Sequence, residues 1–97
     1  MIRTRFSSAA EKDLLAAQEW YARQRPGLDL SFRDELDRTL AQIRAHPASF
    51  PILHEKIRRA NLRRFPYGVF YVVRVDHVFI LGVIHHSRHP SRWKSRW

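Results

Sequence analysis

The stretch that decides the fold runs from Leu62 to Val73, LRRFPYGVFYVV, and resumes from Val78 to His86, VFILGVIHH. From Tyr67 onward, alternate residues of the first run would line the two faces of a strand. The second run is apolar up to its closing pair of histidines, which is typical of a strand buried on both faces. Asp76-His77 is expected to form a two-residue hairpin turn between the runs. The sequence therefore predicts an antiparallel strand pair in the middle of a sheet.

Two helices are predicted on the N-terminal side of this strand pair. Ser8 to Glu11 matches the S-x-x-E capping box, so the first helix is expected to start there and to run to about residue 23. Pro26-Gly27 ends that helix, and Asp29 or Ser31 is expected to cap the second one. The second helix must end before Pro47, which disfavours helical geometry at the residue preceding it. Two helices joined by a short turn form an antiparallel hairpin.

The remaining segments complete an α+β fold in a single domain spanning residues 1–97. A short strand is expected at Ile2 to Phe6, and a basic strand from Ile57 to Arg64, which we place at a sheet edge or beside a groove. The predicted order is β-α-α-β-β-β, a small antiparallel-rich sheet with the α-helical hairpin packed on one face. The other face is expected to lie largely open to a partner, sheltered by loops and by a short turn or helix that Trp93 packs against it.

Positive charge is concentrated in the second part of the chain. The formal net charge is +9, and residues 1–37 hold six Lys/Arg against seven Asp/Glu. Residues 38–97 hold twelve Lys/Arg against two Asp/Glu, a net charge of +10. Such a field favours nucleic acid, a ribosome or an acidic protein as the partner.

Composition also narrows the chemistry and the location. The chain has no cysteine, so neither disulfides nor thiolate catalysis are expected. No apolar run approaches the ~20 residues of a membrane span, and we expect no membrane partner. The first residues lack the apolar stretch of a signal peptide, so the expected location is the cytoplasm.

Acid–base cleavage of RNA is one chemistry that the closing residues of the second run allow. It needs a base, an acid and cations on the phosphate oxygens. His85 and His86 titrate in the right range, although neighbours in a strand point to opposite faces. Arg63 and Arg88 would supply positive charge. The alternative interpretation is two rim histidines and arginines on a solvated surface.

A metal site is disfavoured, although His85, His86 and His89 lie within five residues. Metal ligands must converge on one point, and adjacent strand residues diverge. We therefore expect no metal and no cofactor. Binding without chemistry is the remaining alternative, because arginines interleaved with aromatic residues suit RNA as well as an acidic peptide. The candidate binding residues are Arg58, Arg59, Arg64, Arg92 and Trp93.

The chain resembles the RelE/ParE superfamily of bacterial type II toxins over nearly its whole length. The residues that carry the resemblance are Asp13-Leu14, Trp20-Tyr21, QRPGL at residues 24–28, RFPYGVFY at residues 64–71, and the pattern H-x-x-R-x-P-x-x-W from His85 to Trp93. The resemblance implies a small basic toxin that is neutralised by an antitoxin, usually encoded beside it, whose C-terminal segment wraps the toxin in a hetero-oligomeric complex.

The superfamily has two mechanisms. RelE-like members cleave messenger RNA in the ribosomal A site, with basic residues on the sheet and a C-terminal Tyr or His. ParE-like members inhibit DNA gyrase and have largely lost these basic residues and the C-terminal Tyr or His. Gly68 stands where RelE-like proteins often have Arg, and no Tyr follows Tyr71. Both departures favour the ParE side.

The leading hypothesis is therefore a ParE-like toxin that inhibits gyrase. The first alternative is a ribosome-dependent endoribonuclease that uses His85 or His86 with Arg63 and Arg88. The second alternative is a degenerate member that still binds an antitoxin but is not toxic. In the non-catalytic cases, Arg58, Arg59, Arg64, Arg92 and Trp93 are expected to contact the antitoxin or the target.

Overall fold

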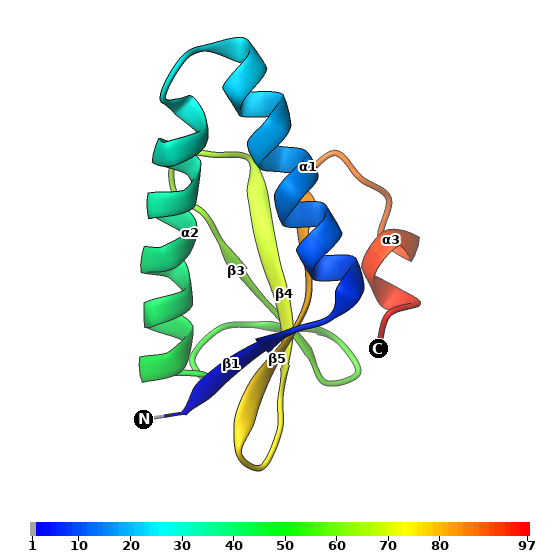
Figure 1. Cartoon of the computed structure of the whole chain (residues 1–97). Coiled ribbons are helices and arrows are strands. Elements are labelled where there is room, and N and C mark those ends of the chain that lie inside the picture. Colours follow the sequence, from blue (N-terminus) through cyan, green and yellow to red (C-terminus); the bar gives the residue numbers. More distant parts are fainter. Residues whose placement is uncertain (1) are drawn as a thin grey trace.

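The computed structural model describes residues 2–97, which form two long helices, one short helix and one sheet (Figure 1). Within this range the elements follow in the order β1 (Arg3–Phe6), α1 (Ser8–Gln24), α2 (Leu28–Ala45), β2 (Ile52–His54), β3 (Ile57–Asn61), β4 (Tyr67–Val73), β5 (His77–His85) and α3 (Ser91–Lys94).

The sheet has five strands in the order β1-β5-β4-β3-β2. β1 runs parallel to β5, and the other neighbours are antiparallel. The hairpin of α1 and α2 covers one face of the sheet (Figure 1). The predicted α+β class, the helix hairpin and the central position of β5 are confirmed.

β2 is a strand that the sequence did not reveal. It has only three residues, and its pairing with β3 shifts register between Ile52 and His54, so it is too short and irregular to show a period. Because β2 occupies the edge, β3 lies between two strands, and the expected edge position of the basic strand is wrong.

The basic strand also ends earlier than predicted, at Asn61 rather than Arg64. The chain then leaves the sheet in a loop, residues 62–66, which is anchored by the buried side chains of Leu62 and Phe65. Arg63 and Arg64 are exposed on this loop.

Three local boundaries differ by one to four residues from the prediction. Ser7, not Ser8, caps α1, since its Oγ accepts from the Ala10 N–H at 3.0 Å. α2 starts after Gly27, whose φ of 86° is left-handed, and no side chain caps the helix. The β4–β5 turn is centred on residues 75 and 76, because the Arg74 N–H donates to the His77 carbonyl at 2.8 Å.

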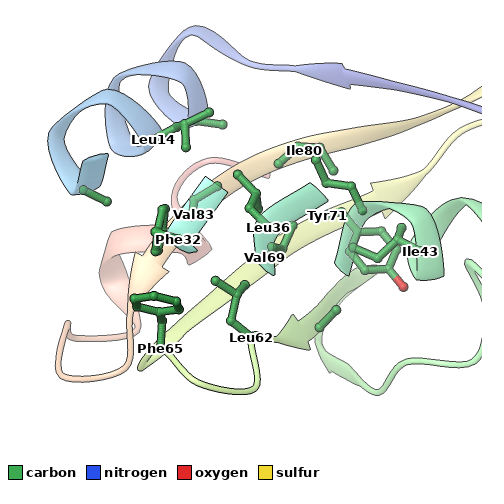
Figure 2. Packing of buried hydrophobic residues seen from close by; sticks show 14 of the residues in the cluster. Leu14, Phe32, Leu36, Ile43, Leu62, Phe65, Val69, Tyr71, Ile80 and Val83 are labelled. Carbon is green, nitrogen blue, oxygen red and sulfur yellow. The ribbon is translucent and has the colours of Figure 1, made fainter. Parts of the chain in front are cut away.

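The main core lies between the helix hairpin and the sheet. Figure 2 shows Phe32, Leu36 and Ile43 from α2 meeting Val69 and Tyr71 of β4. All five are 0% exposed. The Tyr71 hydroxyl donates to the Pro47 carbonyl at 2.7 Å, so the one polar group of this ring is satisfied.

The opposite face of the sheet is covered more fully than expected. Phe70, Val72 and Leu81 are at most 3% exposed, and the Trp93 ring stacks on Phe70 at 4.9 Å between ring centroids. The prediction that Trp93 packs the tail against the sheet is confirmed. The expectation that the apolar part of this face is open to a partner is wrong.

Candidate functional site

A cleft runs between α1 and the end of β5, where the chain leaves the sheet. It consists of two adjoining hollows, of about 90 and about 710 Å³, that share the lining residues Ala16, Tyr67, His85 and Arg88. We call it the α1–β5 cleft. The other lining residues are Asp13, Ala17, Val83, Ile84 and Arg92 in the smaller hollow and Trp20, Tyr21, Arg23, Pro66 and Ser87 in the larger one.

Aromatic rings form much of the larger hollow. Trp20 is 49% exposed and meets the Tyr21 ring edge-on at 5.0 Å, and Tyr67 meets the His85 ring edge-on at 5.2 Å. Tyr21 is buried and stacks on Phe32 in the core, so the cleft wall is rigidly backed. An exposed Trp beside a packed aromatic wall is a surface typical of protein recognition.

Unpaired arginines surround this apolar surface. The side chains of Arg23, Arg88 and Arg92 are exposed and make no hydrogen bond or ion pair with any part of residues 2–97. Asp13 is the single acidic residue among those lining the two hollows. The cleft is therefore apolar at its wall and cationic at its rim.

The charge of Asp13 is already matched inside the protein. Arg96 Nη1 donates to Asp13 Oδ2 at 2.6 Å and Nη2 donates to Oδ1 at 3.3 Å, with both side chains less than 20% exposed. Asp13 Oδ2 also accepts from the Val83 N–H at 3.1 Å. Arg96 Nη1 further donates to the Leu81 carbonyl at 3.1 Å. The Asp13 and Arg96 side chains thus bond to backbone groups of β5 beyond the point where its pairing with β1 ends.

Gly82 makes room for this arrangement. A Cβ atom at position 82 would lie 2.7 Å from Arg96 Nη1 and 2.7 Å from Ile84 Cδ1. Such distances do not occur between unstrained atoms, and the guanidinium reaches Leu81 because residue 82 has no side chain.

Two groups in the cleft can exchange or donate protons. Burial raises the pKa of Tyr67 above 10.0, Arg88 opposes this to a smaller extent, and Asp13 adds to the rise. Tyr67 is therefore a neutral hydrogen-bond donor at pH 7. His85 Nδ1 accepts from the Ser87 N–H at 3.0 Å, which leaves the proton of the neutral ring on Nε2.

His86 lies outside the cleft lining and has a different environment. Its Nε2 is 3.1 Å from Asn61 Oδ1. Burial lowers the pKa of His86, and the charges of Arg59 and His85 lower it further. The ring is therefore neutral at pH 7 and donates from Nε2 to Asn61. The stem of Arg59 lies against Gly68, where a Cβ atom would be 2.9 Å from Arg59 Cδ.

The predicted site residues fall on separate surfaces. His85, Arg88 and Arg92 line the α1–β5 cleft, whereas Arg63 and Arg64 line a hollow beside α2. Arg58 donates from Nη1 to the carbonyls of Ala48 at 3.1 Å and Phe50 at 2.7 Å, and Trp93 is buried, so both have structural contacts. The four catalytic candidates, His85, His86, Arg63 and Arg88, are thus not gathered in one hollow.

Sequence reasoning missed three residues of the cleft as site residues. The sequence pattern places Tyr67 on a strand face and gives Trp20 no site role, because helical spacing does not distinguish a buried ring from one at a rim. Asp13 contributed only to the resemblance. Its pairing with Arg96, 83 residues away, has no local sequence signal.

The described residues provide no metal centre and no membrane span. No three His, Asp or Glu side chains within residues 2–97 are grouped so that they could hold a metal ion. None of the helices in this range has the length and apolar character needed to cross a bilayer.

Comparison with known proteins assigns the family. Residues 4–90 match the protein-family model described as the ParE toxin of type II toxin-antitoxin system, parDE. The chain belongs to the ParE toxin family. The chromosomal ParDE TA system from P. aeruginosa has a solved structure that is similar in fold, with a TM-score of 0.77 and 19% identity over 88% of this chain and 96% of that chain. A search among curated proteins found no match.

Membership of the ParE family confirms the resemblance and its ParE-like side. The protein is the toxin component of a type II toxin–antitoxin module. The segments that carried the resemblance include α1, the turn before α2 and strand β4, and residues of α1 and β4 contribute to the core and to the lining of the α1–β5 cleft.

Proposed function

We propose that this ParE-family toxin inhibits DNA gyrase and that the α1–β5 cleft contacts the enzyme. The observation that carries the proposal is the exposed Trp20 above an aromatic wall, with Arg23 and Arg88 unpaired at the rim. Large aromatic residues and arginines dominate the binding energy of protein interfaces. The separation of Arg63 from His85 and Arg88 further favours protein binding over catalysis.

We also propose that an acidic antitoxin neutralises the toxin in a hetero-oligomeric complex in the cytoplasm, where gyrase acts. The net charge of +10 in residues 38–97 supports an acidic partner, because complementary charge accelerates association and selects the partner. The solved relative is itself a ParDE toxin–antitoxin system.

Supercoiling by purified gyrase tests the target. The toxin should block supercoiling of relaxed plasmid or accumulate cleaved plasmid, and it should leave translation in a cell-free extract intact. Arg88→Glu should lose most of this inhibition, because it places an anion in the cationic rim. Arg5→Glu is the matched control, since Arg5 is exposed on β1 and lies outside the cleft. Full gyrase activity at saturating wild-type toxin would refute the proposal.

The endoribonuclease alternative has one supporting observation. His85, Tyr67 and Arg88 share the cleft, and they could supply a base, a hydrogen-bond donor and a cation near a phosphate. In that case His85→Ala should abolish growth arrest, and induced cells should contain messenger RNA cut at ribosomes. Intact messages in arrested cells would exclude the nuclease, and the absence of any growth arrest would favour a degenerate, non-toxic member.

A further inference from the structure

A second hollow lies on the surface between α2 and the loop of residues 62–66. Its volume is about 400 Å³, and its lining residues are Glu35, Arg38, Thr39, Gln42, Arg63 and Arg64. We call it the α2 hollow. It shares no lining residue with the α1–β5 cleft, so it is a separate feature of the surface.

The α2 hollow has an excess of positive charge that the protein does not neutralise. Its lining holds three arginines and one glutamate, a net charge of +2. Neither Arg38 nor Arg63 has a side-chain hydrogen bond or ion pair with another of residues 2–97. Both residues are exposed, and their guanidinium groups are free to bind an anion from solution.

Glu35 fixes the orientation of the third arginine. Its side chain is only 6% exposed, and Arg64 Nε donates to Glu35 Oε1 at 3.2 Å. The Arg64 guanidinium also lies 5.9 Å from the centroid of the Phe65 ring. The contact with Glu35 uses Nε, and the two amino groups of Arg64 make no other hydrogen bond within the described chain. A buried carboxylate thus positions an arginine whose fork remains available.

The composition of the lining favours a phosphate over a peptide. Every lining residue carries a polar or charged group and none is aromatic, in contrast to the α1–β5 cleft, so the α2 hollow lacks the aromatic surface on which a peptide side chain would anchor. One carboxylate is satisfied by one arginine fork, whereas a phosphate has oxygens for several guanidinium groups. Thr39 Oγ1 is already used, since it donates to the Glu35 carbonyl at 2.9 Å, but the Gln42 amide remains available as a further donor.

We propose that the α2 hollow binds a phosphate group through Arg38, Arg63 and Arg64, and that the phosphate belongs to a nucleic-acid backbone. Glu35 is a positioning residue, since it holds Arg64 without contacting the ligand. The site does not depend on gyrase inhibition or on an antitoxin. Free inorganic phosphate has the same binding chemistry, and the experiment below separates the two sources.

Binding of a fluorescein-labelled DNA duplex, followed by anisotropy at several salt concentrations, tests the site. Arg38→Gln and Arg63→Gln should each weaken binding by roughly tenfold at low salt. Each should also reduce the slope of log K against log salt by about 1. Arg5→Gln removes the same charge from an exposed position on β1 and should change the affinity by less than about twofold. Equal losses in all three variants would overturn the proposal, because they would indicate bulk charge alone.

Glu35 provides a test that separates a built site from a positive patch. Glu35→Gln makes the protein more positive, so a mere patch would bind the duplex more tightly. A positioned fork would instead bind it more weakly, because a neutral amide oxygen holds the Arg64 Nε–H less firmly than the carboxylate does. Arg64→Lys is the companion variant on the surface, which keeps the charge but loses the planar fork, and it should also weaken binding. Tighter duplex binding by Glu35→Gln with unchanged binding by Arg64→Lys would refute the positioned site.

Competition identifies the ligand. NMR shifts of the Gln42 side chain and the Arg63 amide on adding inorganic phosphate, with no displacement by duplex, would assign the site to free phosphate. Displacement of phosphate by duplex would assign it to the backbone. Both results support a phosphate site, and the first would overturn its assignment to a nucleic-acid backbone. Polyglutamate that competes as well as the duplex does at equal charge would overturn the proposal in favour of an acidic protein.

Discussion

Gly82 illustrates how one missing side chain holds the C-terminal tail in place. We predict that Gly82→Ala lowers the free energy of unfolding by about 1–3 kcal/mol, because the new methyl group would overlap Arg96 Nη1 and Ile84 Cδ1. Urea denaturation measures the change. In an Arg96→Ala background the same substitution should be less harmful, since one of the two clashes is gone. An equal loss in both backgrounds would show that Arg96 is not the group that requires glycine.

His86 gives a prediction about pH. Burial and the charges of Arg59 and His85 lower its pKa in the folded protein below 6.5. Below pH 6.5 the unfolded chain therefore binds more protons at this residue, and its contribution to stability is lost as the pH falls through this range. NMR titration of the ring protons should give His86 a pKa below that of the same residue in an unfolded peptide. A higher value in the folded protein would contradict the dominant effect of burial and of the neighbouring Arg59 and His85 charges.

Residue roles could be predicted from sequence where the pattern is local. Trp93 was expected to pack the tail, and it does so on Phe70. Gly68 stood out by comparison with nuclease relatives, but its contact with the Arg59 stem depends on the pairing of β3 with β4. The Asp13–Arg96 pair joins residues near the two ends of the chain, and only the folded topology brings them together.

At the scale of elements, the start of α1 is a measurable boundary. Ser7 accepts the Ala10 N–H, whereas Ser8 is the first residue of the helix and is exposed. We predict that Ser7→Ala lowers the free energy of unfolding by about 1 kcal/mol and that Ser8→Ala changes it by less than about 0.5 kcal/mol. Thermal unfolding of the two variants compares them directly. A larger loss of stability in Ser8→Ala than in Ser7→Ala would show that Ser8 caps the helix, as the capping-box pattern predicts.

Helices and long strands were predictable because each has a sustained pattern, which is a helical period in α1 and α2 and a continuous apolar run in β5. α1 and α2 have apolar residues at helical spacing, and β5 is a nine-residue strand with an apolar centre. β2 could not be predicted, because a strand of three residues that directly follows Pro51 and ends at a turn is too short to show a period. The β4–β5 turn was placed one residue late, since backbone pairing rather than composition decides its register.

At the scale of the whole molecule, basic residues that lie in one part of the sequence are distributed over three separate surfaces of the fold. The first surface holds Arg59 of β3 and His86, which follows the end of β5. The second is the α2 hollow, which is lined by Arg63 and Arg64, and the third is the α1–β5 cleft, which is lined by Arg88. The basic second part of the chain was visible from composition. Its division into distinct surfaces depends on where the loop of residues 62–66 leaves the sheet, which no local pattern determines.

This division predicts that gyrase inhibition and duplex binding can be removed independently. Arg88→Glu should lose most of the inhibition of supercoiling while weakening duplex binding no more than Arg5→Glu does, because Arg88 lines only the cleft. Arg63→Gln should weaken duplex binding roughly tenfold and change inhibition by less than about twofold. The double variant should show the sum of the two free-energy changes, since the hollows share no residue. Strong non-additivity would mean that cleft and hollow act as one continuous surface, with a single partner spanning both.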